Sequence, residues 1–180
     1  DEAEVRGIAA SGATVAICPT TEANLGDGLF PLRAFLAAGG RYGIGSDSHV
    51  SVSPIEDLRW LEYGQRLVEQ KRSRALLGPG SNAEAMLRAV AASAAASTGQ
   101  GIGTLQTGGA VDALVLDADA PAMVGATPED ALDRWVFCGN RPLVRDVFVD
   151  GRRVVADGRH PQRESAAAAY AATLRRLLSN

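Results

Sequence analysis

The first hundred residues alternate between helical apolar patterns and short apolar runs. Val5, Ile8 and Ala9 form a stripe at helical spacing that ends at Gly12. Residues 13–18 then form a compact, almost continuous apolar run that is closed by a proline. Such a run is typical of a strand covered on both faces in a parallel sheet. The pattern therefore predicts a helix followed by a buried strand.

A second unit of the same kind follows. Residues 20–28 are polar and contain glycines, which predicts a loop, and residues 31–38 predict a short helix that stops at Gly39-Gly40. Residues 42–45 predict the next short strand. Two strand-loop-helix units in succession indicate right-handed connections and an α/β architecture.

Two longer helices are predicted beyond this point. The first begins at Pro54 and is broken by Gly78-Pro79-Gly80, with acidic and basic residues gathered at the ends that the helix dipole favours. The second spans residues 83–97, with Asn82 as its N-cap and Gly99 after its end. This second helix is rich in alanine, so we expect it to pack closely against a neighbour.

The composition shifts after residue 98 towards glycines and short strands. Asp150-Gly151 lies between two strand-like segments and is typical of a type I′ turn, so it predicts a β-hairpin. The predicted elements are a strand at 111–117, a short helix at 128–135, hairpin strands at 145–149 and 152–156, and an amphipathic helix at 161–178.

Composition and charge favour a globular protein that acts on small molecules. The chain has 180 residues, 46% hydrophobic and 22% charged, enough for one domain or two small ones. Its net charge of -3 comes without a long run of one sign, which argues against nucleic acid or an anionic membrane as partner. No apolar run approaches the roughly 18 residues that cross a bilayer. Cys18 and Cys138 form no CxxC pair and no secretory leader is present, so we predict a cytoplasmic protein.

Asp47 and His49 are the first candidates for chemistry. They lie two residues apart where the second predicted strand gives way to a loop of small residues. Side chains at this spacing in an extended segment point to the same side, so both can act on one ligand as a metal site or an acid/base pair. The alternative is ordinary turn and N-cap chemistry ahead of the helix that begins at Pro54.

The polar segment after the first strand is a second candidate. Its side chains stand at the carboxyl end of a predicted parallel strand, where βα sheets and barrels build their sites. The alternative is a loop that caps its own backbone. The residues concerned are Thr20, Thr21, Glu22, Asn24 and Asp27.

Three segments together resemble the amidohydrolase superfamily, and within it the enzymes that deiminate formimidoylglutamate. The segments are Ala16-Ile17-Cys18-Pro19-Thr20-Thr21-Glu22-Ala23-Asn24-Leu25-Gly26-Asp27-Gly28, Gly43-Ile44-Gly45-Ser46-Asp47-Ser48-His49, and residues 54–67. Residues 113–117 and 149–155 are similar to the small β-domain that many members share. The resemblance covers essentially the whole chain.

This resemblance implies the C-terminal part of a (β/α)₈ TIM barrel, with residues 13–18 as strand 7 and residues 42–46 as strand 8. Residues 1–98 would be the barrel portion, residues 99–160 a β-rich segment of a small composite β-sandwich, and residues 161–180 a C-terminal helix. Because the chain begins without Met inside a helical pattern, we expect the remainder of the same polypeptide to complete the barrel.

The resemblance also implies chemistry. The expected reaction converts N-formimidoyl-L-glutamate and water to N-formyl-L-glutamate and ammonia in histidine breakdown, with a zinc ion that acidifies water. Asp47 matches the strand-8 aspartate, which would bind the zinc and carry the proton. His49, Glu22 and Asn24 would meet the substrate. The other zinc ligands of such barrels are histidines, and their motifs are absent here.

Two other interpretations stay open. Another zinc aminohydrolase of the superfamily, acting on guanine or an adenosine-type ring, would share the strand-8 aspartate. Alternatively, the chain is a non-catalytic module, because one candidate ligand cannot hold a zinc that usually needs three protein ligands or more. We expect the isolated chain to be inactive. The resemblance also allows a homodimer.

Overall fold

A computed structural model of the chain describes residues 1–179, which divide into two compact units. The first unit comprises residues 1–104 and 118–140, and the second comprises residues 105–117 and the chain from residue 141 onward. Contacts therefore assign 118–140 to the first unit. The predicted division at residues 98 and 160 concerns the complete protein, and it stays a prediction.

The first unit is built on two parallel strands. Helix α1 (Glu2–Ser11) is capped by the Asp1 side chain and ends at Gly12, whose φ of 74° is left-handed. Strand β1 (Thr14–Ile17) pairs in parallel with β2 (Arg41–Ile44), from Thr14 opposite Arg41 to Ile17 opposite Ile44. The two predicted strands and their parallel order are confirmed.

The polar segment between these strands differs from its prediction. Residues 20–28 were expected to form a loop, but α2 (Pro19–Leu25) is helical and ends at Gly26, with φ 77°. Proline is favoured at the first helical position, and the Glu22 carboxylate accepts the backbone N–H of Cys18 at 2.7 Å. These two local interactions start a helix in a segment whose composition is that of a loop. Helix α3 (Leu32–Ala37) follows, as predicted.

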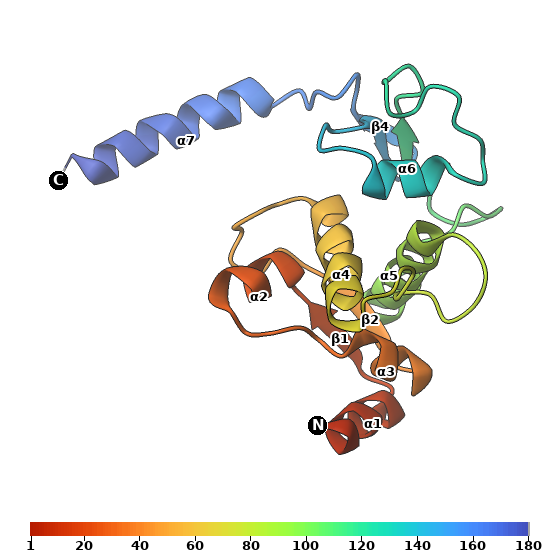
Figure 1. The fold of residues 1–180 in the computed structure, drawn as a ribbon. Helices are drawn as coiled ribbons and strands as arrows, with labels where there is room; N and C mark the ends of the chain where they lie inside the picture. Colours follow the sequence, from red (N-terminus) through yellow and green to blue (C-terminus); the bar gives the residue numbers. More distant parts are fainter. Residues whose placement is uncertain (180) are drawn as a thin grey trace. The chain divides into compact units, whose positions relative to one another are not determined.

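Three more helices complete the first unit. Helix α4 (Pro54–Glu69) ends earlier than predicted, because Gln70 turns into the left-handed region at φ 52°. Helix α5 (Asn82–Thr98) is capped by Ser81, one residue before the predicted cap, and Gly99 ends it. The structure places α6 at Ala131–Phe137. Helices α4 and α5 both contact β2, and α6 contacts both helices (Figure 1).

The core of the first unit lies where these helices meet the parallel strands. Its most buried members include Phe35 from α3, Tyr42 from β2 and Met86 from α5. Gly40 precedes β2, and a Cβ there would lie 2.4 Å from the Phe35 ring, so the ring needs a glycine at this position. The start of β2 is thus fixed by close packing.

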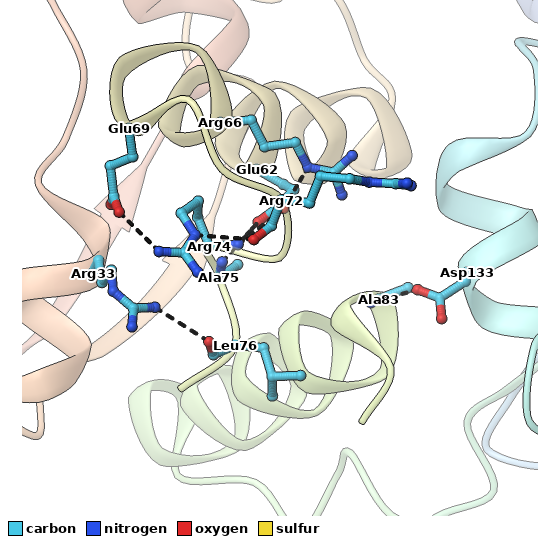
Figure 2. Close-up of polar contacts among 10 residues, drawn as sticks. All are labelled: Arg33, Glu62, Arg66, Glu69, Arg72, Arg74, Ala75, Leu76, Ala83 and Asp133. Atoms are coloured by element: carbon cyan, nitrogen blue, oxygen red, sulfur yellow. Dashed lines mark hydrogen bonds and ion pairs between the residues drawn. The ribbon is translucent and has the colours of Figure 1, made fainter. Parts of the chain in front are cut away.

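A buried carboxylate connects the middle of α4 to the segment before α5. Glu62 is fully buried and accepts hydrogen bonds from Arg66 Nε at 2.6 Å, from Arg74 N at 3.0 Å and from Ala75 N at 2.7 Å (Figure 2). Burial alone would raise the pKa of Glu62, but the Asn82 amide beside it and these donors outweigh burial, so the pKa is lowered. The charged Glu62 carboxylate therefore stabilises the fold.

The second unit is an antiparallel sheet with a helix after it. Strands β3 (Ala113–Leu116), β4 (Val144–Val149) and β5 (Arg152–Val155) pair in the order β3-β4-β5. The hairpin turns at Asp150 and Gly151, with φ of 50° and 74°, as the type I′ prediction requires. Helix α7 (Arg163–Leu178) has no buried residue within the described part of the chain. No helix among residues 1–179 is both long enough and apolar enough to span a bilayer.

Candidate functional site

The candidate site lies at the carboxyl ends of the two parallel strands, in the turn after β2. The last sheet-like contact is the Gly45 N–H, which donates to the Ile17 carbonyl at 3.1 Å. The chain then closes a turn in which His49 N–H donates to the Ser46 carbonyl at 3.0 Å. Asp47 and His49 adopt left-handed conformations, with φ of 44° and 57°.

This turn corrects the geometry predicted for the pair. Asp47 and His49 were expected to point to the same side because they lie two residues apart in an extended segment. The segment is not extended. Pairing with β1 stops at Gly45, and the Ser46 carbonyl then accepts the His49 N–H within the turn. The alternation rule for strands therefore does not apply to Asp47 and His49.

The turn is held from helix α2 by a single buried side chain. The Thr21 hydroxyl donates to the Ser46 carbonyl at 2.9 Å and lies 3.0 Å from the Ser48 hydroxyl. It also accepts the Ser48 backbone N–H at 3.3 Å. The residues on both sides of Asp47 are thus bonded to one atom of α2.

Helix α2 is in turn attached to α4. The backbone N–H and the hydroxyl of Thr20 both donate to Asp57 Oδ1, at 3.2 and 2.9 Å. Burial raises the pKa of the Asp57 carboxyl, and the hydrogen bonds from Thr20 offset only part of that effect. The amino end of α2 is therefore held by α4, through contacts that do not involve the turn.

Negative charge gathers around the Cys18 thiol at the end of β1. Burial raises the pKa of this thiol, and three nearby carboxylates raise it further: Asp47, Glu22 and Asp57. Since like charges disfavour a thiolate, Cys18 stays protonated at neutral pH and is a poor nucleophile. The acidic surroundings suit a cation or a basic substrate group.

The four predicted site residues differ in where they lie. Asp47 and His49 are exposed in the turn, and Glu22 is half-buried with one oxygen bonded to Cys18 N. Asn24 is exposed on α2. Asp47 and Glu22 thus share the surroundings of Cys18.

The described residues cannot hold a metal ion by themselves. No group of three or more His, Cys, Asp or Glu side chains within residues 1–179 is arranged to bind one. A zinc site usually takes three or four protein ligands. Asp47 is exposed, and its carboxylate could be one ligand of such a site.

Sequence reasoning missed two residues that organise the site. In the sequence, Thr21 is one of several polar residues of a predicted loop, and Asp57 is one of the acidic residues at the start of the helix predicted from Pro54. Leu58 and Leu61 are buried, and Asp57 lies next to Leu58 and four residues before Leu61, so helical spacing places Asp57 on the buried side of α4. Nothing in the sequence distinguishes Thr21 from Thr20.

A small pocket between α2 and α4 does not include the turn. Its walls are mainly apolar, and Glu22 is the one charged residue that lines it within the described part of the chain. Gln65 closes one side and donates to the Phe30 carbonyl at 2.7 Å. The pocket is therefore separate from Asp47.

Comparison with known proteins gives a consistent result. The model of the amidohydrolase family matches residues 2–154. Formimidoylglutamate deiminase from Pseudomonas aeruginosa is 50% identical over 99% of this chain and 40% of its own length. A 5-methylthioadenosine/S-adenosylhomocysteine deaminase from Natronomonas pharaonis is 28% identical over 87% of this chain and 35% of its own length. The chain thus spans about 40% or less of these curated relatives.

Solved structures agree on the fold. The crystal structure of an amidohydrolase from Brucella melitensis superposes with a TM-score of 0.91 at 37% identity, covering 99% of this chain and 39% of that one. Atrazine chlorohydrolase TrzN from Arthrobacter aurescens, complexed with zinc, gives a TM-score of 0.78 at 26% identity and covers 96% of this chain and 38% of that one. The architecture is thus that of part of an amidohydrolase TIM barrel.

Proposed function

The chain belongs to the amidohydrolase family, and from that premise we propose that it is part of an enzyme that hydrolyses N-formimidoyl-L-glutamate to N-formyl-L-glutamate and ammonia. The observation that carries this proposal is the 50% identity to a formimidoylglutamate deiminase along 99% of the chain. The reaction is the hydrolysis of a linear amidine, and its place would be in histidine breakdown.

The parallel pair supports a role as the last two barrel strands. Barrels of this kind build their sites at the carboxyl ends of the strands, which is where the Asp47 turn stands. The remainder of the same polypeptide would supply the other strands and the remaining metal ligands, so the isolated chain would be inactive.

Asp47 would bind zinc and move a proton. The exposed carboxylate and the negative surroundings of Cys18 support a cation beside it. Zinc, when bound, supplies an activated water. The Asp47 carboxylate would accept a proton from the attacking water and deliver it to the nitrogen that departs as ammonia.

The remaining predicted residues would contact the substrate. His49 follows Asp47 in the same turn, from where its imidazole would hydrogen-bond the formimino group. Glu22 has one carboxylate oxygen free of the contact to Cys18, and Asn24 is exposed farther along α2. Both would line the mouth of the site.

A ring aminohydrolase is the second candidate. The observation in its favour is the similarity to 5-methylthioadenosine/S-adenosylhomocysteine deaminases, at 28% identity over 87% of the chain. The lower identity makes it the weaker candidate. A homodimer, also compatible with this family, stays a prediction.

The test is substrate turnover by the complete protein that carries this sequence, together with its zinc content. We expect ammonia release from formimidoylglutamate, at least 100-fold faster than from 5-methylthioadenosine or guanine, and about one zinc per subunit by elemental analysis. Turnover of a ring substrate without turnover of formimidoylglutamate would contradict the proposal.

A further inference from the structure

The hydroxyl of Thr21 uses its full bonding capacity on the Asp47 turn. A threonine hydroxyl has one proton to donate and two lone pairs. It donates to the Ser46 carbonyl at 2.9 Å and accepts the Ser48 N–H at 3.3 Å. The remaining lone pair faces the Ser48 hydroxyl at 3.0 Å, so Ser48 donates in that contact.

The Thr21 end of these bonds is shielded from water. Thr21 is only 2% exposed, so solvent does not replace its hydroxyl when the bonds break. Without the hydroxyl, the Ser48 N–H loses its partner and the Ser46 carbonyl retains only the His49 N–H. A hydrogen bond of this kind typically contributes about 1 kcal/mol, and a methyl group in place of the hydroxyl cannot make one, so the turn would rearrange.

The atom that holds the turn is itself fixed. Thr21 lies between Thr20, which is bonded to Asp57, and Glu22, which is bonded to the Cys18 backbone. Its position relative to β1 and α4 is therefore set by contacts that do not involve the turn.

Asp47 needs such support. A residue other than glycine in the left-handed region persists only when its surroundings hold it there, and such residues gather at functional sites. Asp47 has a φ of 44°, and both its neighbours are bonded to Thr21. The direction of the Asp47 carboxylate depends on that backbone.

From this geometry we infer that Thr21 is a positioning residue, whose hydroxyl fixes the backbone on both sides of Asp47 and so directs the Asp47 carboxylate. The inference rests on the function proposed above for Asp47. Thr21 touches no reacting atom, and it acts only through the turn.

The experiment compares four variants of the complete enzyme. Thr21→Val keeps the shape and removes the hydroxyl, and Thr21→Ser keeps the hydroxyl. Ser81→Ala removes the N-cap of α5, away from the turn, and controls for a general loss of stability. Asp47→Asn tests the proposed function independently.

Four quantities are measured for each variant: kcat, KM, the rate of zinc loss and the melting temperature. Residues that orient a metal ligand typically affect activity or metal affinity by about 10- to 100-fold. We therefore expect Thr21→Val to lower kcat by about 10- to 100-fold, to leave KM within about threefold, and to speed zinc loss to a chelator by about tenfold. Thr21→Ser should restore kcat to within about threefold, and Ser81→Ala should lower only the melting temperature.

Hydrogen exchange of residues 45–50 in the metal-free enzyme gives a readout that is independent of activity. Thr21→Val should accelerate it, whereas Ser81→Ala should not. Wild-type kcat, zinc retention and exchange in Thr21→Val, beside a strong loss in Asp47→Asn, would overturn the inference about Thr21. Wild-type activity in Asp47→Asn would instead overturn the proposed function.

If Thr21→Val does not fold, a variant of Ser48 tests the role of the Thr21 hydroxyl instead. Ser48 is exposed, so Ser48→Ala removes one contact of the Thr21 hydroxyl without a change in the core. A fewfold lower kcat at an unchanged melting temperature would support the inference, and an unchanged kcat would overturn it.

Discussion

Two carboxylates of the first unit, Glu62 and Asp47, are held in opposite ways. The Glu62 carboxylate is fully buried, and donors from Arg66, Arg74 and Ala75 bind its oxygens (Figure 2). The Asp47 side chain is exposed, and no residue within 1–179 donates a hydrogen bond to it, although its backbone is bonded through its neighbours to Thr21.

The difference separates a structural charge from a functional one. A carboxylate whose oxygens are all bonded within the protein stabilises the fold and has nothing left for a ligand. A carboxylate with free oxygens on a fixed backbone is prepared to bind something that is not part of the chain. Glu62 is of the first kind, and the proposed function makes Asp47 one of the second.

The largest effect on stability is expected at Glu62. Glu62→Ala would leave the Arg66 charge, the buried Ala75 N–H and the partly buried Arg74 N–H without their partner, which costs about 3–5 kcal/mol in the free energy of unfolding. Denaturant unfolding of the complete enzyme measures it. Glu69→Ala, on the same helix and in a partly exposed pair with Arg74, should cost about 1 kcal/mol or less. Equal losses in the two variants would contradict the distinction.

A smaller loss is expected from Gly40, which fixes the start of the strand that leads to the turn. Gly40→Ala would push a methyl group into the Phe35 ring, and overpacking of this kind typically costs about 1–3 kcal/mol. Gly43→Ala in the same strand meets no atom within 4 Å and serves as the control. A melting temperature unchanged by Gly40→Ala would show that the ring moves freely.

His49 should affect binding and not folding. We expect His49→Ala to raise KM for formimidoylglutamate about fivefold, since one hydrogen bond contributes about 1 kcal/mol. The melting temperature should stay the same, because His49 is exposed. His160→Ala, in the second unit, is the control for the kinetics. An unchanged KM in His49→Ala would remove His49 from the site.

The second unit offers a pH test of a structural carboxylate. The Arg153 guanidinium, helped by Arg145 and the Asp157 N–H, holds the pKa of Asp146 at about 2, below the usual 3.8. A lowered pKa means that the stabilisation is complete above pH 3.8 and is lost as the pH falls through about 2. Unfolding measured from pH 5 to 2 should therefore show a loss of stability that Asp146→Asn abolishes. The same acid loss in Asp146→Asn would exclude Asp146 as its source.

The elements with strong periodic signals were predictable from the sequence. The parallel strands follow from short apolar runs, and the hairpin follows from Asp150-Gly151, because the type I′ turn needs positive φ at both positions. Helix α2 was not predictable from composition, since its seven residues are stabilised by Pro19 and by the Glu22 carboxylate bound to Cys18 N. Local hydrogen bonds of this kind leave no periodic trace.

The proposed site was predictable only in its position. A carboxylate after a parallel strand is visible in the sequence, and it makes Asp47 a candidate. Its turn was not, because the turn depends on a contact with Thr21, 25 residues away from Ser46 along the chain. Long-range contacts of single hydroxyl groups cannot be derived from a pattern of apolar and polar positions.

The most direct measurement of the central claim is the turnover of formimidoylglutamate by Asp47→Asn in the complete enzyme, beside its melting temperature. We expect kcat to fall by about 10²- to 10⁴-fold, the usual contribution of a group that transfers protons. The melting temperature should stay within about 2 °C of the wild type, since Asp47 is exposed. Glu2→Gln, at an exposed carboxylate of α1, should retain full activity. Activity of Asp47→Asn within threefold of the wild type would contradict the account.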